Sequence, residues 1–266
     1  MKNSPTHPRL LIELCAGGID DVLLAAELQI DRIELNSGMA LGGLTPSPGL
    51  VGAARQVFSG PIVAMVRPRE AGFTYSDAEF DLMLADCEVL LAAGINGIAI
   101  GCLTSVGSID VQRCAAIRRR CSSATLVFHK AFDGTSDLHL AARQLIDVGF
   151  DRILTSGGST TAVAGIRTTQ QLIRDFGSQI QFVVGGGVRA ENLETIVRET
   201  GCDQIHSSVR GVVECPLSAG DCECDFGAIS SEGVTGFGIA DRTQLERLMQ
   251  AALDQNERRQ KSKSRQ

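Results

Sequence analysis

The feature that most constrains the fold is an alternation, repeated eight times, of a short apolar run with a longer segment of helical periodicity. Short buried strands that alternate with amphipathic helices are typical of parallel βα units. Segment 77–93 is one such helix, and glycines such as Gly94 and Gly149 follow helical runs, where they suit helix ends. The strands are expected at residues 9–15, 31–36, 61–67, 96–101, 124–130, 151–156, 180–186 and 203–208.

Eight βα units predict an α/β fold of the (β/α)8 TIM type, a closed barrel. The competing architecture, a doubly wound open sheet, usually carries Gly-x-Gly-x-x-Gly after its first strand, whereas residues 15–20 read CAGGID. The length of 266 residues suits one barrel. We expect a single barrel domain over residues 9–255, between a flexible N-terminal tail at 1–8 and a basic C-terminal tail at 256–266.

One connection is too long for a simple turn. Residues 209–240 lie between the eighth strand and the last helix, whereas a βα loop usually has about two to six residues. This long loop after strand 8 is expected to be a lid or a binding loop. The alternative is an inserted surface loop without a role.

Composition and charge exclude several classes of protein. The net charge of −6, the absence of tryptophan and the single tyrosine argue against nucleic-acid partners. No apolar run reaches the roughly 18 residues of a membrane helix. The nine cysteines and the lack of a secretory signal indicate reduced thiols in the cytoplasm. We therefore expect a cytoplasmic protein with a small-molecule or metal ligand, and the sequence is compatible with a homo-oligomer.

Strand phase predicts which side chains enter the barrel. Alternate strand residues face the helices, so the apolar positions define the outward phase and leave the intervening ones inside. Five ionisable side chains then converge near the C-terminal ends of the strands, where barrel enzymes place their active sites. They are Glu13, Glu34, Arg67, His129 and His206. The same phase turns Lys130 away from the interior, as a rim charge.

This set suits acid–base chemistry. A carboxylate and an imidazole can exchange protons with a substrate while Arg67 holds its anionic group. The alternative is that Arg67 and two carboxylates form a buried ion-pair network that only fills the barrel. Either histidine taken alone is compatible with a buried core imidazole.

Glycine-rich turns follow the sixth and seventh expected strands. In many barrels the last strands bind phosphate through glycine amides and a helix N-terminus. The alternative is that these glycines serve turn geometry only. The predicted anion-binding residues are Ser156, Gly157, Gly186, Gly187, Arg189 and Ser207.

Cysteines offer two candidate metal positions. Cys215, Cys222 and Cys224 form C-x6-C-x-C in the long loop, which is not the spacing of a zinc knuckle. Cys15 points inward beside Glu13 and is a separate thiol candidate for a metal, although a strand cysteine is most often a small buried hydrophobe.

Several motifs occur together in one order: IELC at 12–15, AELQIDRIEL at 26–35, GGLTPS at 42–47, VRPR at 66–69, FTYSD at 73–77, FHKAFD at 128–133, RILTSG at 152–157, GGGVRAEN at 185–192 and IHSS at 205–208. In these motifs, over about residues 9–210, the chain resembles the CutC family, named for copper homeostasis. The resemblance implies a TIM-type barrel, a cytoplasmic location and an association with copper tolerance or copper binding. Family members often carry cysteine where this chain has Asn36, so a copper site that used that thiol together with Cys15 lacks one ligand here.

Two hypotheses follow. The resemblance implies a copper-homeostasis protein with Cu(I) as its one candidate cofactor and Cys15 as a metal ligand. The residues favour an enzyme of the lyase or isomerase class that acts on a small polar or phosphorylated carbonyl or sugar compound, because Cu(I) selects thiols rather than carboxylates and guanidinium. Its catalytic residues would be Glu13, Glu34, Arg67, His129, Asp133 and His206.

Overall fold

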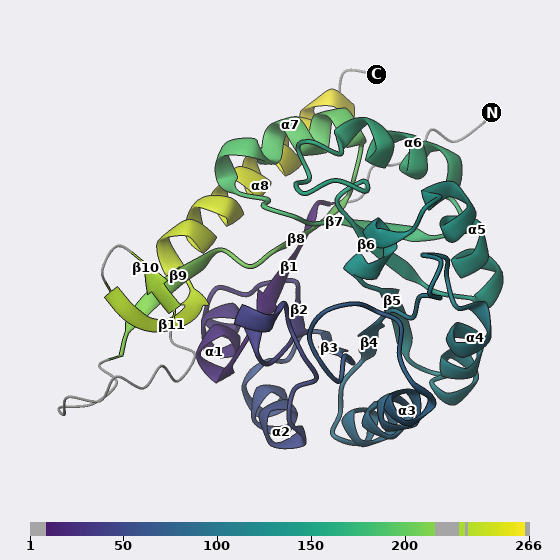
Figure 1. Ribbon diagram of the computed structural model, residues 1–266. Coiled ribbons are helices and arrows are strands. Elements are labelled where there is room, and N and C mark those ends of the chain that lie inside the picture. Colours follow the sequence, from purple (N-terminus) through teal and green to yellow (C-terminus); the bar gives the residue numbers. More distant parts are fainter. Residues whose placement is uncertain (1–8, 216–228, 232–233, 264–266) are drawn as a thin grey trace.

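In the computed structural model, strands β1 to β8 form a closed parallel barrel (Figure 1). The structure describes residues 9–215, 229–231 and 234–263. Each barrel strand pairs with its sequence neighbours, and β1 pairs with β8 to close the ring. The barrel strands are β1 (Leu11–Ala16), β2 (Arg32–Leu35), β3 (Ile62–Met65), β4 (Gly97–Ile100), β5 (Thr125–Phe128), β6 (Arg152–Thr155), β7 (Gln181–Val184) and β8 (Gln204–Ser207). The predicted TIM-type barrel is therefore confirmed.

Helices surround this barrel (Figure 1). Their ends follow local sequence signals: Ser76 Oγ accepts from Glu79 N and Glu79 Oε2 accepts from Ser76 N, a capping box that starts α3. Gly149, at φ 91°, ends α5 in the left-handed conformation. The helices are α1 (Ile19–Glu27), α2 (Pro48–Val57), α3 (Asp77–Ala92), α4 (Val111–Arg120), α5 (Leu138–Val148), α6 (Ile166–Phe176), α7 (Ala190–Thr200) and α8 (Arg242–Lys263), with 3-10 turns η1 (Met39–Leu41) and η2 (Lys130–Gly134).

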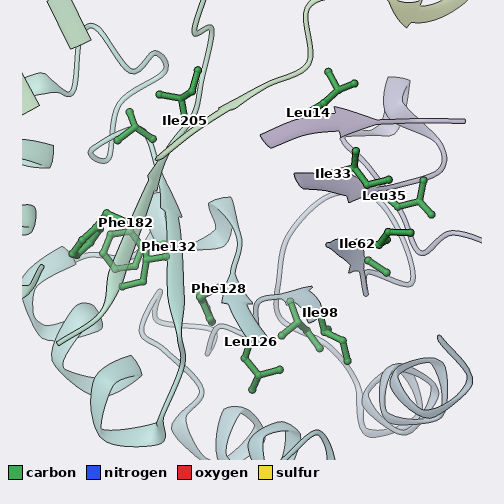
Figure 2. Close-up of a cluster of buried hydrophobic side chains, with 14 of the residues drawn as sticks. Leu14, Ile33, Leu35, Ile62, Ile98, Leu126, Phe128, Phe132, Phe182 and Ile205 are labelled. Carbon is green, nitrogen blue, oxygen red and sulfur yellow. The ribbon is translucent and has the colours of Figure 1, made fainter. Parts of the chain in front are cut away.

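The barrel strands bury two separate sets of apolar side chains. The larger set packs between strands and helices, and Figure 2 shows members of it such as Leu14, Ile33 and Leu126. The smaller set fills the barrel interior and comprises Val63, Met65, Ala99, Val127, Leu154 and Val183. Residues expected to face the helices belong to the first set, whereas Val63, Met65 and Val127 belong to the second, so the expected strand phase holds in the structure.

The chain after β8 differs from the expected loop. Strands β9 (Arg210–Glu214), β10 (Ile229–Ser231) and β11 (Val234–Ala240) form a small antiparallel sheet beside the barrel (Figure 1). The long loop expected between β8 and the last helix therefore contains regular structure, in which β9 and β11 pair along their lengths.

The last helix extends into the predicted C-terminal tail. Helix α8 continues to Lys263, so the boundary expected at residue 255 falls inside a helix. Arg258 Nη1 bonds to Glu194 and Arg259 Nη2 donates to the carbonyl of Cys202, which holds this stretch against α7 and the start of β8. The predicted N-terminal tail at 1–8 lies outside the described residues. In the described chain, no helix is both long enough and apolar enough to cross a membrane.

Candidate functional site

A cavity of about 120 Å³ opens at the end of the barrel where the strands finish; we call it the mouth cavity. Its walls come from β1, β2 and β8 on one side and from the ends of β3 and β5 on the other. Its lining includes Cys15, Glu34, Asn36, Arg67, Phe73, His129, Lys130 and His206. The alternation along the strands correctly predicted that Glu34, Arg67, His129 and His206 lie together, since all four line this cavity.

Glu13 lies one layer deeper, on β1. Its carboxylate accepts from Arg32 Nε at 2.5 Å and lies 2.7 Å from His206 Nδ1, and its side chain is 2% exposed. Burial would raise the pKa of Glu13, but Arg32 and then His206 outweigh burial and lower that pKa to about 2. Glu13 is therefore an anion that orients the imidazole of His206.

Three ligand-type side chains meet above Glu13. The Cys15 thiol, the Glu34 carboxylate and the His206 imidazole each offer one atom within 4.8 Å of the others. Burial raises the pKa of Cys15 and also the pKa of Glu34, because each anion would be desolvated. Burial lowers the pKa of His206, but the neighbouring Glu34, Cys15 and Glu13 raise it well above its usual value.

Asn36 occupies the end of β2 beside this group. Its Nδ2 lies 3.5 Å from Cys15 Sγ and 3.1 Å from Glu34 Oε1, so the amide donates toward both. Asn36 was noted in the sequence only as a departure from cysteine. Its role as a donor to a thiol and a carboxyl depends on the pairing of β1 with β2, which places Cys15 beside Glu34.

Arg67 does not form the buried network with two carboxylates that was the alternative to a binding role. In the described chain, Arg32 is the guanidinium paired with a buried carboxylate inside the barrel. Arg67 donates to the carbonyl oxygens of Leu41, Gly43 and Ala71, and so clamps the loops after β2 and β3. Nothing in the sequence distinguishes Arg32 from Arg67 as the partner of Glu13.

His129 is a neutral imidazole at the end of β5. Its Nδ1 accepts from Ala131 N at 3.1 Å, and its ring centroid lies 5.0 Å from that of Phe73. Burial, together with the charge of Arg67, lowers the pKa of His129 to about 3. A neutral imidazole whose Nδ1 accepts must carry its proton on Nε2.

Lys130 lines the mouth cavity, which corrects the expectation that it points away. The regular strand phase ends at Phe128, and η2 then turns the chain. Lys130 Nζ donates to Ser156 Oγ at 2.6 Å and to Asp133 Oδ2 at 3.0 Å. The motif FHKAFD could have warned of this change, because its polar residues follow the strand rather than belong to it.

Asp133 organises the turn after β6. It accepts from Thr155 Oγ1 at 2.5 Å, from Ser156 N at 2.9 Å and from Gly158 N at 2.8 Å. Of these donors, Ser156 was predicted to bind an external anion, and Asp133 already supplies an anion there. Burial would raise the pKa of Asp133, but the Thr155 hydroxyl, Lys130 and the backbone donors lower it.

The turn after β7 is separate from the mouth cavity. Arg189 Nη1 donates to the carbonyl of Val188 at 2.9 Å, and Ser207 Oγ donates to the same carbonyl at 2.8 Å. Gly186 and Gly187 adopt left-handed φ angles of 105° and 74°. None of the six described residues predicted to bind an anion lines the mouth cavity, namely Ser156, Gly157, Gly186, Gly187, Arg189 and Ser207.

The cysteine pattern in the long loop is only partly visible. Cys215 is exposed and is a free thiol at the end of β9. Cys222 and Cys224 lie outside the described residues. Cys15 is therefore the one of these metal candidates that the structure describes within the mouth cavity.

Comparison with known proteins agrees with these features. The CutC family model matches residues 10–211. A family protein CutC from Treponema denticola is 40% identical over 195 residues, 73% of this chain and 79% of that protein. A copper homeostasis protein cutC homolog from Homo sapiens is 32% identical over 238 residues, 90% of this chain and 87% of that protein.

Solved structures also include a similar CutC protein. The crystal structure of a protein described as copper homeostasis protein CutC, from Streptococcus agalactiae, has a TM-score of 0.71 and 34% identity, and the match covers 74% of this chain and 97% of that chain. A thiamine phosphate pyrophosphorylase from Pyrococcus furiosus, at 14% identity and a TM-score of 0.56, shares the barrel fold alone. With the family motifs, the matched length and the shared barrel in agreement, the chain belongs to the CutC family.

Proposed function

We propose that this protein acts in copper homeostasis and binds Cu(I) in the mouth cavity through Cys15, Glu34 and His206. The observation that carries the proposal is the meeting of these three side chains, from β1, β2 and β8, within 4.8 Å. Two relatives, from Homo sapiens and Mus musculus, are named as copper homeostasis proteins. Thiol and imidazole ligands suit Cu(I), and imidazole also suits Cu(II).

The surroundings of the three residues support a metal ligand role. Glu13 engages His206 Nδ1 and fixes the ring, which leaves Nε2 as the atom that would bind a metal in exchange for its proton. Glu34 Oε2 is buried and has no hydrogen-bond partner among the described residues. The Asn36 amide donates toward Cys15 Sγ at 3.5 Å, a contact that the thiolate formed on metal binding would retain.

We further propose a cytoplasmic location and a ligand no larger than a metal ion or a small molecule, without nucleic-acid partners. The seven cysteines that the structure describes are free thiols, which is typical of a reducing compartment. The net charge of −6 opposes binding to a phosphate backbone.

The test is a Cu(I) competition titration under anaerobic, reducing conditions with a chelator of known affinity. Wild type is expected to bind one Cu(I), and Cys15→Ala is expected to weaken binding at least about tenfold, because the softest ligand is lost. His206→Gln should also weaken binding, since its imidazole is the second ligand.

Thiols in the long loop provide the matched control. A Cys215→Ser, Cys222→Ser, Cys224→Ser triple variant removes the C-x6-C-x-C pattern and should leave the Cu(I) affinity unchanged. Loss of stoichiometric binding in the triple variant, with full retention in Cys15→Ala, would contradict the proposed site and move it to the loop.

A second candidate function is a lyase or isomerase acting on a small polar or phosphorylated carbonyl or sugar compound. The observation that favours it is that two carboxyl groups on neighbouring strands have opposite pKa shifts, lowered for Glu13 and raised for Glu34. The test is deuterium exchange from solvent into a panel of such compounds. Exchange by wild type and none by Glu34→Gln would support the enzyme, and no exchange with any compound would count against it.

A further inference from the structure

The mouth cavity collects buried polar atoms that have no partner. Among the described residues, Glu34 Oε2, Arg67 Nε and His129 Nε2 are buried without a hydrogen bond, and all three side chains line this cavity. A fourth such atom, Asn36 Oδ1, faces Gly43, where an added Cβ would stand 2.5 Å away. Buried donors and acceptors are nearly always paired in native proteins, so three unpaired ones beside one cavity indicate a ligand that satisfies them.

Arg67 has one nitrogen without any partner. Its Nη1 donates to the carbonyls of Leu41 and Gly43, and one N–H of Nη2 donates to the carbonyl of Ala71, whereas Nε–H has no acceptor among the described residues. The residue is 6% exposed, so water does not readily replace the missing partner. The guanidinium keeps its positive charge in this position.

His129 offers the second donor. Its Nδ1 and Cε1 edge packs against Gly101, where an added Cβ would lie 2.7 and 2.5 Å from these two atoms. Nδ1 accepts from Ala131 N, so the proton is on Nε2, and the residue is 3% exposed. The ring of Phe73 lies against both donors, 5.3 Å from Arg67 Cζ and 5.0 Å from the His129 ring, and so ties them to one wall of the cavity.

The lining beside these donors presents an acceptor. Glu34 comes from β2, which pairs with β3, the strand before Arg67, and its Oε2 has no partner among the described residues, so it can receive a hydrogen bond from a ligand. The Nε–H of Arg67 and the Nε2–H of His129 match the two oxygens of one carboxylate, whereas a phosphate group has more oxygens to satisfy. The cavity, at about 120 Å³, is far below the roughly 300 Å³ of ordinary ligand pockets.

We propose that the mouth cavity is a binding site for a small monocarboxylate that carries a hydroxyl or amino group, with its carboxylate on Arg67 Nε–H and His129 Nε2–H and its second group donating to Glu34 Oε2. The ammonium of Lys130, at the rim of the same cavity, adds positive charge where the anion enters. This site goes beyond copper binding and does not require a metal.

The first experiment is calorimetric titration of metal-free protein with glycolate, acetate, glycolamide and glycine. Glycolate is expected to bind one to one, acetate about tenfold more weakly, and glycolamide not measurably, because it lacks the charge. Glycine distinguishes an amino from a hydroxyl donor. Equal binding of glycolate and glycolamide, or saturable binding of neither glycolate nor glycine, would overturn the proposal.

The second experiment assigns the donors. His129→Asn keeps an acceptor for Ala131 N, because asparagine Oδ1 replaces Nδ1, but removes Nε2–H, and it should weaken glycolate binding at least about tenfold. Arg69→Lys changes a neighbouring arginine that bonds to Glu79 instead, and should leave binding unchanged. Unchanged binding in His129→Asn would exclude this site.

Two further measurements keep the result interpretable. Glycolate should shift the Nε–H resonance of Arg67 in the NMR spectrum of wild-type protein, which needs no variant to fold. Both proposed sites use Glu34, so Cys15→Ala separates them: glycolate binding that persists in this variant would show that the carboxylate site does not depend on the copper-ligand thiol, and its loss there would overturn the claim that the site does not require a metal.

Discussion

At the scale of single residues, charge inside the barrel is arranged as a chain of contacts. Arg32 Nη2 donates to Gln204 Oε1, Arg32 Nε donates to Glu13, and Glu13 holds His206 at the level of the mouth cavity. A buried charge left alone is costly, so each member stabilises the state of the next. The position of His206 therefore depends on residues that do not line the cavity.

Glu13→Gln tests this chain. The pKa of Glu13 is about 2 in the folded protein, below its ordinary value of 4.5. The stability that it contributes is therefore present above about pH 4.5 and is lost as the pH falls toward 2. We expect Glu13→Gln to lower the free energy of unfolding at pH 7 by about 3 kcal/mol and to flatten its decline between these pH values.

The measurement is urea unfolding of wild type and variant over a series of pH values. Glu27→Gln is the control, because Glu27 pairs with Arg242 on the surface and both side chains are about half exposed. It should leave the unfolding midpoint nearly unchanged. An equal acid response in Glu13→Gln and wild type would show that Glu13 does not carry the acid sensitivity.

At the scale of elements, one aspartate joins the small sheet to the barrel. Asp21, in the first turn of α1, accepts from Ala240 N at the end of β11 and from Arg210 Nη1 at the start of β9, both at 2.7 Å. It also accepts from Gly17 N at 2.6 Å. The sheet that follows β8 is thus held against α1 and the loop after β1, the strand that carries Cys15.

Asp21→Ala should release this attachment. The change removes three hydrogen bonds to a side chain that is 2% exposed and leaves Arg210 without its carboxylate partner. We expect a loss of about 3 kcal/mol in the free energy of unfolding and faster amide exchange at Ala240. Hydrogen exchange read by mass spectrometry checks both effects, with the exposed neighbour Asp20→Ala as the control. Unchanged exchange at Ala240 would show that other contacts hold the sheet.

At the scale of the whole molecule, α8 completes the helical layer of the barrel. Figure 1 shows α8 beside α7. In sequence, α8 lies at the opposite end of the described chain from β1. Leu245 and Leu248 are fully buried on this helix, and Leu10 N, at the start of the barrel, donates to Asn256 Oδ1. The two ends of the described chain therefore stabilise one another.

Leu248→Ala should destabilise the entire barrel rather than α8 alone. Truncating a leucine with no exposed surface leaves a cavity and costs about 2 to 5 kcal/mol, whereas Leu253→Ala, on the same helix but 52% exposed, should cost less than about 1 kcal/mol. The thermal unfolding midpoints by circular dichroism and by calorimetry should fall together in Leu248→Ala. A separate early transition would mean that α8 unfolds independently.

Periodicity was sufficient to predict the barrel and the inward set, because apolar spacing is a local property of each strand and helix. It correctly placed Glu34, Arg67, His129 and His206 around one cavity. The family could also be predicted from local sequence, because each of the nine motifs that carry the resemblance is contiguous in the chain.

Only the tertiary structure decided which of these groups touch. Strand register pairs Cys15 with Glu34 and Glu13 with His206, and it makes Arg32, not Arg67, the partner of Glu13. The turn after β5 brings Lys130 to the cavity, and Asp133 occupies the glycine corner that the sequence suggested for an anion. Sequence determined the fold through spacing along the chain, whereas contacts between strands depend on register and loop path, which arise only when all eight units close into one ring.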